Sequence, residues 1–263
     1  SSAQRNCLLT EEDVEMISTL SLFTLNTLFC SLPIRCPPTL TMMKQNMGES
    51  AAKVLCEKQS NLGIITLNRT PALNAADLEM TSTIRMSLKK WQESNDMDTL
   101  ILKSSSDRAF CSGGDIKAIA NSLTTDPTNK LPEKALASEY LLLSELKNAD
   151  VLKIAVIDGV VMGFGAGLAG VCDVRVVSER ALFAMPENAI GLFPDVGFCH
   201  LSQRVWGTPP SVAAYLALTG ARLGGSAGPA EDLVRVGFAT HFVEASRVAA
   251  LVAALEQGGG GGR

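Results

Sequence analysis

The chain has 263 residues, of which 46% are apolar and 19% charged, with a net charge of -4 at pH 7 and a pI near 5.3. A chain of this length can bury one sizeable core, and its acidic balance argues against direct DNA binding or any general polyanion-binding surface. The seven cysteines form no CxxC pair and there are only two histidines, so we expect a reducing compartment and no zinc site.

The first 50 residues differ from the rest in composition. An uncharged run from Met16 to Ile34 is about long enough to span a membrane, but seven of its positions are Ser, Thr or Asn. Acidic residues precede it at positions 11, 12, 13 and 15, whereas signal and transit peptides avoid acids. We therefore expect no stable membrane insertion, with targeting as the alternative role of this segment.

Strand and helix patterns alternate along residues 53–256. In chain order we predict strands at 53–58 and 62–68, a helix at 75–95, a strand at 99–103, helices at 115–121 and 133–148, a strand at 152–158, a helix at 163–171, strands at 174–177 and 182–184, helices at 202–206, 210–218 and 230–236, a strand at 239–243 and a helix at 245–255. Strands joined by crossover helices indicate an α/β domain with a largely parallel sheet. We divide the chain into a poorly defined N-terminal extension (1–50), this domain (51–257) and a flexible polyglycine tail (258–263).

Two glycine-rich turns each join a strand to the start of a helix. The first is Ala109–Asp115, which contains Gly113 and Gly114, and the second is Met162–Gly167. Glycine lets a ligand approach the backbone, and a helix N-terminus offers free N–H groups. One N–H group from each turn can therefore hold a developing oxyanion. The alternative, in which the glycines only allow close packing of helix on sheet, stays open.

Residues 184–197 set two carboxylates, Glu187 and Asp195, among apolar, Pro and Gly residues. Desolvating a carboxylate is costly, and burial raises its pKa toward the range useful for an acid, base or nucleophile near neutral pH. An ion-paired structural loop is the alternative interpretation.

These motifs, together with residues 218–223 and 237–243, resemble the crotonase (enoyl-CoA hydratase/isomerase) superfamily over about residues 53–256. Within the superfamily, the most similar family is that of the 3-hydroxyisobutyryl-CoA hydrolases. The resemblance implies a crotonase-like spiral of ββα units that holds an acyl-CoA, so that CoA is part of the substrate and no separate cofactor is needed. The hydrolases continue into a further C-terminal helical region, which is apparently truncated in this chain.

The resemblance also implies roles for individual residues. The N–H groups of Gly114 and Phe164 match the pair that binds the thioester oxygen, and Glu139 matches an acyl-pocket position, with a solvated helix carboxylate as the alternative. Glu187 and Asp195 match the catalytic pair of the hydrolases, with Glu187 attacking the thioester or activating water. We expect Asp195 to be ionised if it receives hydrogen bonds, which leaves Glu187 as the perturbed partner.

Two positions separate this sequence from relatives of the superfamily. Gly167 stands where the hydratases carry their second glutamate, which disfavours hydration of a double bond. Phe164 replaces a glycine, and we expect its side chain either to crowd the thioester or to require a different φ.

The expected function is hydrolysis of 3-hydroxyisobutyryl-CoA or a similar short 3-hydroxyacyl-CoA, as in valine breakdown, in mitochondria or alternatively in peroxisomes. One alternative is another crotonase reaction, such as double-bond isomerisation with Glu187 as the base. A second alternative is a non-catalytic component of the mitochondrial ribosomal small subunit. The partners implied are the acyl-CoA substrate and other copies of the chain in a homo-oligomer.

Overall fold

The strands of the fold divide between two sheets, which the computed structural model describes within residues 52–94 and 97–258. The larger sheet has the strand order β1-β2-β3-β5-β7-β10 and the smaller has the order β4-β6-β8-β9. Only the β1–β2 and β8–β9 pairs are antiparallel, so the sheets are largely parallel, as predicted. The strands are β1 (Val54–Gln59), β2 (Leu62–Leu67), β3 (Thr99–Ser104), β4 (Ala109–Cys111), β5 (Leu152–Ile157), β6 (Val160–Met162), β7 (Val174–Val177), β8 (Leu182–Ala184), β9 (Leu223–Gly224) and β10 (His241–Phe242).

From β3 to β8, consecutive strands alternate between the two sheets. β3, β5 and β7 enter the larger sheet, whereas β4, β6 and β8, which follow them directly, enter the smaller one. Helical segments then lead to the next pair: α3 (Ile116–Thr125) and α4 (Leu131–Asn148) after β4, α5 (Phe164–Gly170) after β6, and a 3₁₀ helix (Glu187–Ile190) with α6 (Phe198–Arg204) after β8. This repetition confirms the predicted spiral of ββα units.

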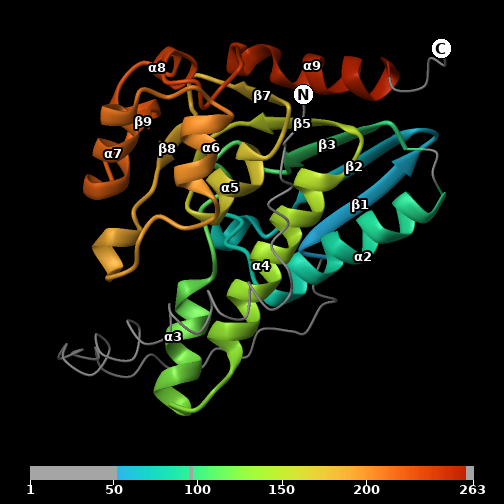
Figure 1. The fold of residues 1–263 in the computed structure, drawn as a ribbon. Coiled ribbons are helices and arrows are strands. Elements are labelled where there is room, and N and C mark those ends of the chain that lie inside the picture. The colour runs from blue at the N-terminus through green and yellow to red at the C-terminus, as the bar shows by residue number, and fades with distance from the viewer. Residues whose placement is uncertain (1–51, 95–96, 259–263) are drawn as a thin grey trace, which may run out of the picture.

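The larger sheet is covered on both faces, because every residue of β2 is buried. Side chains alternate along a strand, so Ile65 and Leu67 lie in the main core while Leu62 and Ile64 join a second cluster on the other face. That second cluster packs against α9 (Ala245–Gly258). Figure 1 shows α9 running along this side of the molecule, beside β5 and β7. Gly258, the first residue of the predicted tail, is the last residue of α9, and residues 259–263 lie outside the described chain.

Helices α2 (Leu78–Ser94) and α4 close the main core on its other side, and α2 buries one face through Met80, Ile84 and Leu88. Helix α3 buries only Ile119, and Figure 1 shows α3 and the first turns of α4 extending away from the two sheets. The remaining helices, α7 (Pro210–Thr219) and α8 (Glu231–Arg235), lie at the opposite side from α2.

Helix α6 lies earlier in the sequence than predicted, at Phe198–Arg204 instead of 202–206. Gly197 precedes it at φ 74°, a left-handed conformation that lets the chain turn from an irregular loop directly into the helix. Trp206 lies beyond the helix end, and its ring packs edge-on against Phe198 and Phe238 in the core.

Among the described residues, no helix combines the length and the apolar composition that crossing a membrane requires. The uncharged run from Met16 to Ile34 and the rest of the predicted N-terminal extension lie outside these residues.

Candidate active site

The first glycine turn lies between β4 and α3 and is held by an isolated bridge to Ala76. The N–H of Ala76 donates to the Gly113 carbonyl and the N–H of Asp115 donates to the Ala76 carbonyl, each at 2.8 Å. Successive N–H groups of an extended chain point in opposite directions, so the N–H of Gly114 faces away from Ala76. Asp115 then caps α3 by accepting from the Ala118 N–H at 2.9 Å, which fixes the end of the turn.

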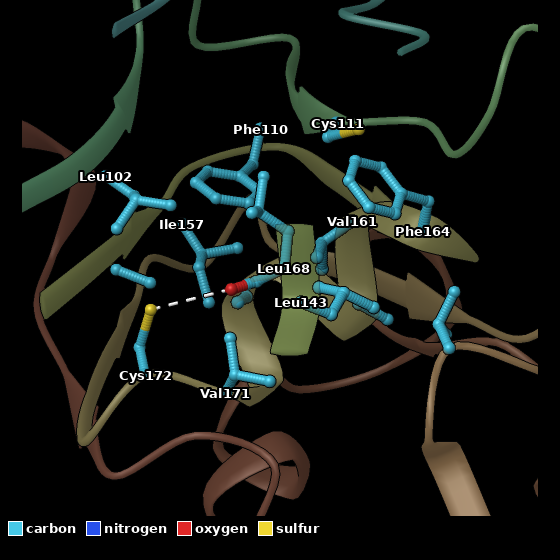
Figure 2. Packing of buried hydrophobic residues seen from close by; sticks show 14 of the residues in the cluster. Leu102, Phe110, Cys111, Leu143, Ile157, Val161, Phe164, Leu168, Val171 and Cys172 are labelled. Carbon is cyan, nitrogen blue, oxygen red and sulfur yellow. Dashed lines mark hydrogen bonds between the residues drawn. The ribbon is translucent and has the colours of Figure 1, made fainter. Parts of the chain in front are cut away.

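The second glycine turn begins α5. Gly163 precedes the helix at φ 51° and Phe164 is its first residue, so the Phe164 N–H has no acceptor within the helix. Phe164 does not require a positive φ, and its side chain is only 3% exposed. Figure 2 shows the Phe164 ring packed in the core near Cys111 and Val161. The Phe164 ring therefore belongs to the core.

The two turns lie side by side. A Cβ atom built on Gly113 would lie 3.5 Å from the Met162 carbonyl oxygen and 4.0 Å from the Phe164 nitrogen. Within the described residues, no protein acceptor takes the N–H of Gly114 or of Phe164. Each turn thus offers a free N–H group, that of Gly114 or that of Phe164, where the two turns meet.

Glu187 is the first residue of the 3₁₀ helix and lies against the second turn, where a Cβ built on Gly163 would come within 3.0 Å of its Oε1. The side chain is buried, and its Oε2 has no hydrogen-bond partner among the described residues. Burial raises the pKa of Glu187 to about 7, and repulsion from Asp195 adds to the rise while a backbone hydrogen bond opposes it.

Glu139 lies on α4 beside the first turn, because a Cβ built on Gly114 would be 2.7 Å from its Oε1. It is 5% exposed, so the alternative of a solvated helix carboxylate is wrong. Burial, with repulsion from Asp195, raises the pKa of Glu139 well above its ordinary value. The surroundings of Glu139 at the site therefore disfavour the charged form of its carboxyl group.

Asp195 lies in the loop before α6, and its Oδ2 accepts a 2.6 Å hydrogen bond from the Tyr140 hydroxyl. Burial raises the pKa of Asp195, while the hydrogen bond from Tyr140 opposes the rise. Neither Glu187 nor Asp195 forms an ion pair within the described part of the chain, so the alternative of an ion-paired loop is wrong.

Gly167 lies in the middle of α5 and faces the loop that carries Asp195. A Cβ built there would lie 2.6 Å from Val196 Cβ, closer than real Cβ atoms come, and 3.1 Å from Leu143 Cδ1. Val196 itself takes a left-handed φ of 47°, which is uncommon for a β-branched residue. The close packing of α5 against this loop therefore leaves no room for a second acidic side chain at position 167.

Every residue singled out from the sequence lies near one centre: Gly114, Phe164, Glu139, Glu187 and Asp195. Sequence reasoning missed Tyr140 as a site residue and treated it only as part of the helix pattern. Its position directly after Glu139, together with the rarity of tyrosine in this chain, was the available signal. Within residues 52–94 and 97–258, no group of three His, Cys, Asp or Glu side chains is arranged to hold a metal ion.

A model of the enoyl-CoA hydratase/isomerase family matches residues 62–260. The chain belongs to this family. Among solved structures, an enoyl-CoA hydratase from Rhodobacter sphaeroides 2.4.1 matches with a TM-score of 0.70 and 33% identity, covering 81% of this chain and 60% of that one. The family and its fold therefore agree with the resemblance seen in the sequence.

The chain is also similar to curated members of the family. It is 41% identical over 204 residues to 3-hydroxyisobutyryl-CoA hydrolase, mitochondrial, from Danio rerio, covering 78% of this chain and 51% of that protein. The Rattus norvegicus protein of the same name is 40% identical over 209 residues, covering 80% and 52%. The chain thus spans about half the length of the curated relatives it matches.

Proposed function

We propose that this protein hydrolyses the thioester of a short 3-hydroxyacyl-CoA, and that 3-hydroxyisobutyryl-CoA is its substrate. The observation that carries the proposal is the Glu187 carboxyl: it is buried, its Oε2 is unpartnered, and it lies beside the free N–H groups of two turns. The relatives named 3-hydroxyisobutyryl-CoA hydrolase support the choice of substrate. CoA would be part of the substrate, with no separate cofactor.

In the proposed reaction, the thioester oxygen accepts hydrogen bonds from the Gly114 and Phe164 N–H groups. These donors stabilise the negative charge that develops on that oxygen when the carbonyl carbon is attacked. The pKa of Glu187 near 7 suits a carboxylate that attacks the thioester or activates water. Near neutral pH the group is ionised in a large fraction of molecules, and its ionised form is sufficiently basic.

Two routes are open to Glu187. As a nucleophile it would attack the carbonyl carbon, expel the CoA thiolate and form an anhydride, which water then hydrolyses. As a general base it would take a proton from water while that water attacks the same carbon. In both routes the products are the 3-hydroxy acid and CoA, and we place Asp195 and Glu139 around the acyl group, with Asp195 accepting from the substrate hydroxyl.

The absence of room at position 167 favours hydrolysis over hydration of a double bond. Hydration in this superfamily uses two glutamates on one water, and the second would have to share the space of Val196. A hydrolase needs only the oxyanion donors and one carboxylate that attacks or activates water, and both are placed together in this site.

A thiol-release assay with 3-hydroxyisobutyryl-CoA tests the proposal. We expect release by the wild-type protein and a loss of at least about a hundredfold in Glu187→Gln, because the amide can neither attack nor accept a proton. Glu57→Gln, on the exposed side of β1, is the matched control and should keep full activity. Wild-type protein that is folded but releases no more thiol than Glu187→Gln would contradict the proposal.

A trapping experiment with the same substrate distinguishes the nucleophilic route from the general-base route. Hydroxylamine added during turnover would trap an anhydride as a hydroxamate on Glu187, which peptide mass spectrometry detects. General-base catalysis leaves Glu187 unmodified.

We also propose a mitochondrial location, which rests on the names of the similar proteins from Danio rerio and Rattus norvegicus. Neither name supports the peroxisomal alternative. The ribosomal role and the homo-oligomer stay predictions.

A further inference from the structure

The site holds three buried or half-buried carboxyl groups, and no cationic side chain of the described residues lies among them. The titratable groups that face one another are Glu139 and Tyr140 from α4, Glu187 from the 3₁₀ helix, Asp195 from the loop before α6, and Cys111 from β4. Burial raises the pKa of Cys111 to about 12, so its thiol is neutral. Charge in this cluster is therefore decided among the three carboxyl groups.

A hydrogen bond from Tyr140 distinguishes Asp195 from Glu187. Its hydroxyl donates to Asp195 Oδ2 at 2.6 Å, whereas Glu187 Oε2 has no partner within the described residues. Tyr140 lies on α4 with its ring buried in the main core, so packing holds its hydroxyl group in place. A hydrogen bond from a neutral donor stabilises the charged form of its acceptor.

We propose that Tyr140 is a positioning residue, which places the negative charge of the cluster on Asp195 and so leaves Glu187 as the carboxyl group that attacks the thioester or takes a proton from water during turnover. The catalytic consequence rests on the proposed function. The distribution of charge among the carboxyl groups does not rest on the proposed function, because it depends only on contacts within the protein.

The Tyr140 hydroxyl donates and Asp195 accepts, so ionised Asp195 is the favoured state of that pair. Ionised Asp195 then repels a second charge on Glu187 or Glu139, and both of those groups show this repulsion among the causes of their raised pKa values. Without the donor, the ionisations of the carboxyl groups would lie closer together and overlap.

Tyr140→Phe tests the proposal, because this variant keeps the buried ring and removes only the hydroxyl group. Carboxyl-carbon NMR of the free protein follows each titration without substrate. We expect the pKa of Asp195 to rise by about one unit in this variant, the size expected for a lost charge-assisted hydrogen bond. Tyr215→Phe, the same change at a hydroxyl on an exposed part of α7, should leave the titrations unchanged.

Hydrolysis of 3-hydroxyisobutyryl-CoA gives the second readout. In Tyr140→Phe the loss of kcat/KM should grow as the pH falls from 8 to 5, because less of Asp195 remains ionised at acid pH in the variant. A residue that only fills space would lose the same factor at every pH.

An unchanged Asp195 titration in folded Tyr140→Phe would overturn the proposal. If that variant does not fold, Asp195→Asn replaces it: Tyr140 can still donate to the amide oxygen, and the pKa of Glu187 should fall because the repelling charge is gone. An unchanged Glu187 titration there would overturn the proposal equally. A wild-type protein without hydrolase activity would contradict the proposed function alone, since the titrations need no turnover.

Discussion

Glu187 links the stability of the fold to pH, because its carboxyl group is buried without a cation. Its pKa is about 7 in the folded protein against 4.5 as the ordinary value, so the folded state holds the proton more tightly than the unfolded chain. Stability from this group is therefore greatest below the unfolded pKa and is lost as the pH rises toward 7. The full loss is about 3 kcal/mol in the free energy of unfolding.

We predict that Glu187→Gln weakens this pH dependence. Urea unfolding gives the free energy of unfolding at pH 5 and at pH 8. The fall in this free energy from pH 5 to pH 8 should be smaller in the variant than in the wild type by about 3 kcal/mol. Buried Glu139 and Asp195 act in the same direction in both proteins, so the difference between the proteins is the quantity to compare. Glu57→Gln should keep the wild-type dependence, and an equal dependence in Glu187→Gln would contradict the prediction.

At the residue scale, the sequence motifs identified most of the residues that meet at the site. Gly114, Phe164 and Glu187 lie within short motifs whose chemistry is readable from neighbouring residues. Tyr140 was not readable in this way, because its partner Asp195 lies 55 residues further along the chain. The motifs also left the burial of Glu139 undecided, since a helix position next to an apolar face can be solvated.

Among the elements, α5 packs closely against the loop that carries Asp195. We predict that Gly167→Ala destabilises the protein by about 1–3 kcal/mol and lowers hydrolysis, because its Cβ would overlap Val196. Thermal unfolding and thiol release measure the two effects.

The double variant Gly167→Ala with Val196→Gly tests the cause. Glycine removes the overlapping Cβ and suits the left-handed φ at position 196, so the pair should lose less stability than the two single changes together. Additive losses would show that the overlap is not the cause.

Arg175 connects β7 to the segment before β10 through hydrogen bonds. This buried guanidinium donates to the carbonyl of Phe238, to that of Cys172 at 2.6 Å and to that of Gly237 at 3.3 Å. We predict that Arg175→Met costs about 3 kcal/mol in the free energy of unfolding, because buried carbonyls lose their donor. Chemical denaturation measures this loss of stability. The control is Arg204→Met, on the exposed side of α6. Equal stability of the two variants would contradict the prediction.

The elements themselves were largely predictable, because apolar periodicity marks any helix or strand long enough to show it. Strands β4, β6 and β9 were not predicted, and their two or three residues are too few to show a period. Strands β8 and β10 are as short, but they fall in the strands predicted at 182–184 and 239–243. β4 and β6 are the strands that carry the two glycine turns, and only their pairing in the smaller sheet brings those turns together.

For the molecule as a whole, α9 closes the outer face of the larger sheet. Its Val248, Val252 and Leu255 pack on a cluster from β2, β3 and β5, and Lys103 pairs with Glu256 at 2.5 Å. We predict that Val252→Asp costs about 2–4 kcal/mol, because it places a charge against this apolar face. Urea unfolding tests this against Ala250→Asp, which lies on the exposed face of the same helix, and equal losses would contradict the prediction.

The sequence by itself determined the family, the ββα order and most of the residues that meet at the proposed site, because these depend on local patterns and short motifs. Only the tertiary structure decided how those residues work together: which amides stay free, which carboxyl group receives the Tyr140 hydrogen bond, and why position 167 holds no acid. The physical reason is that burial, charge repulsion and packing act between groups far apart along the chain. Their strength is set by distances that exist only once the two sheets have formed.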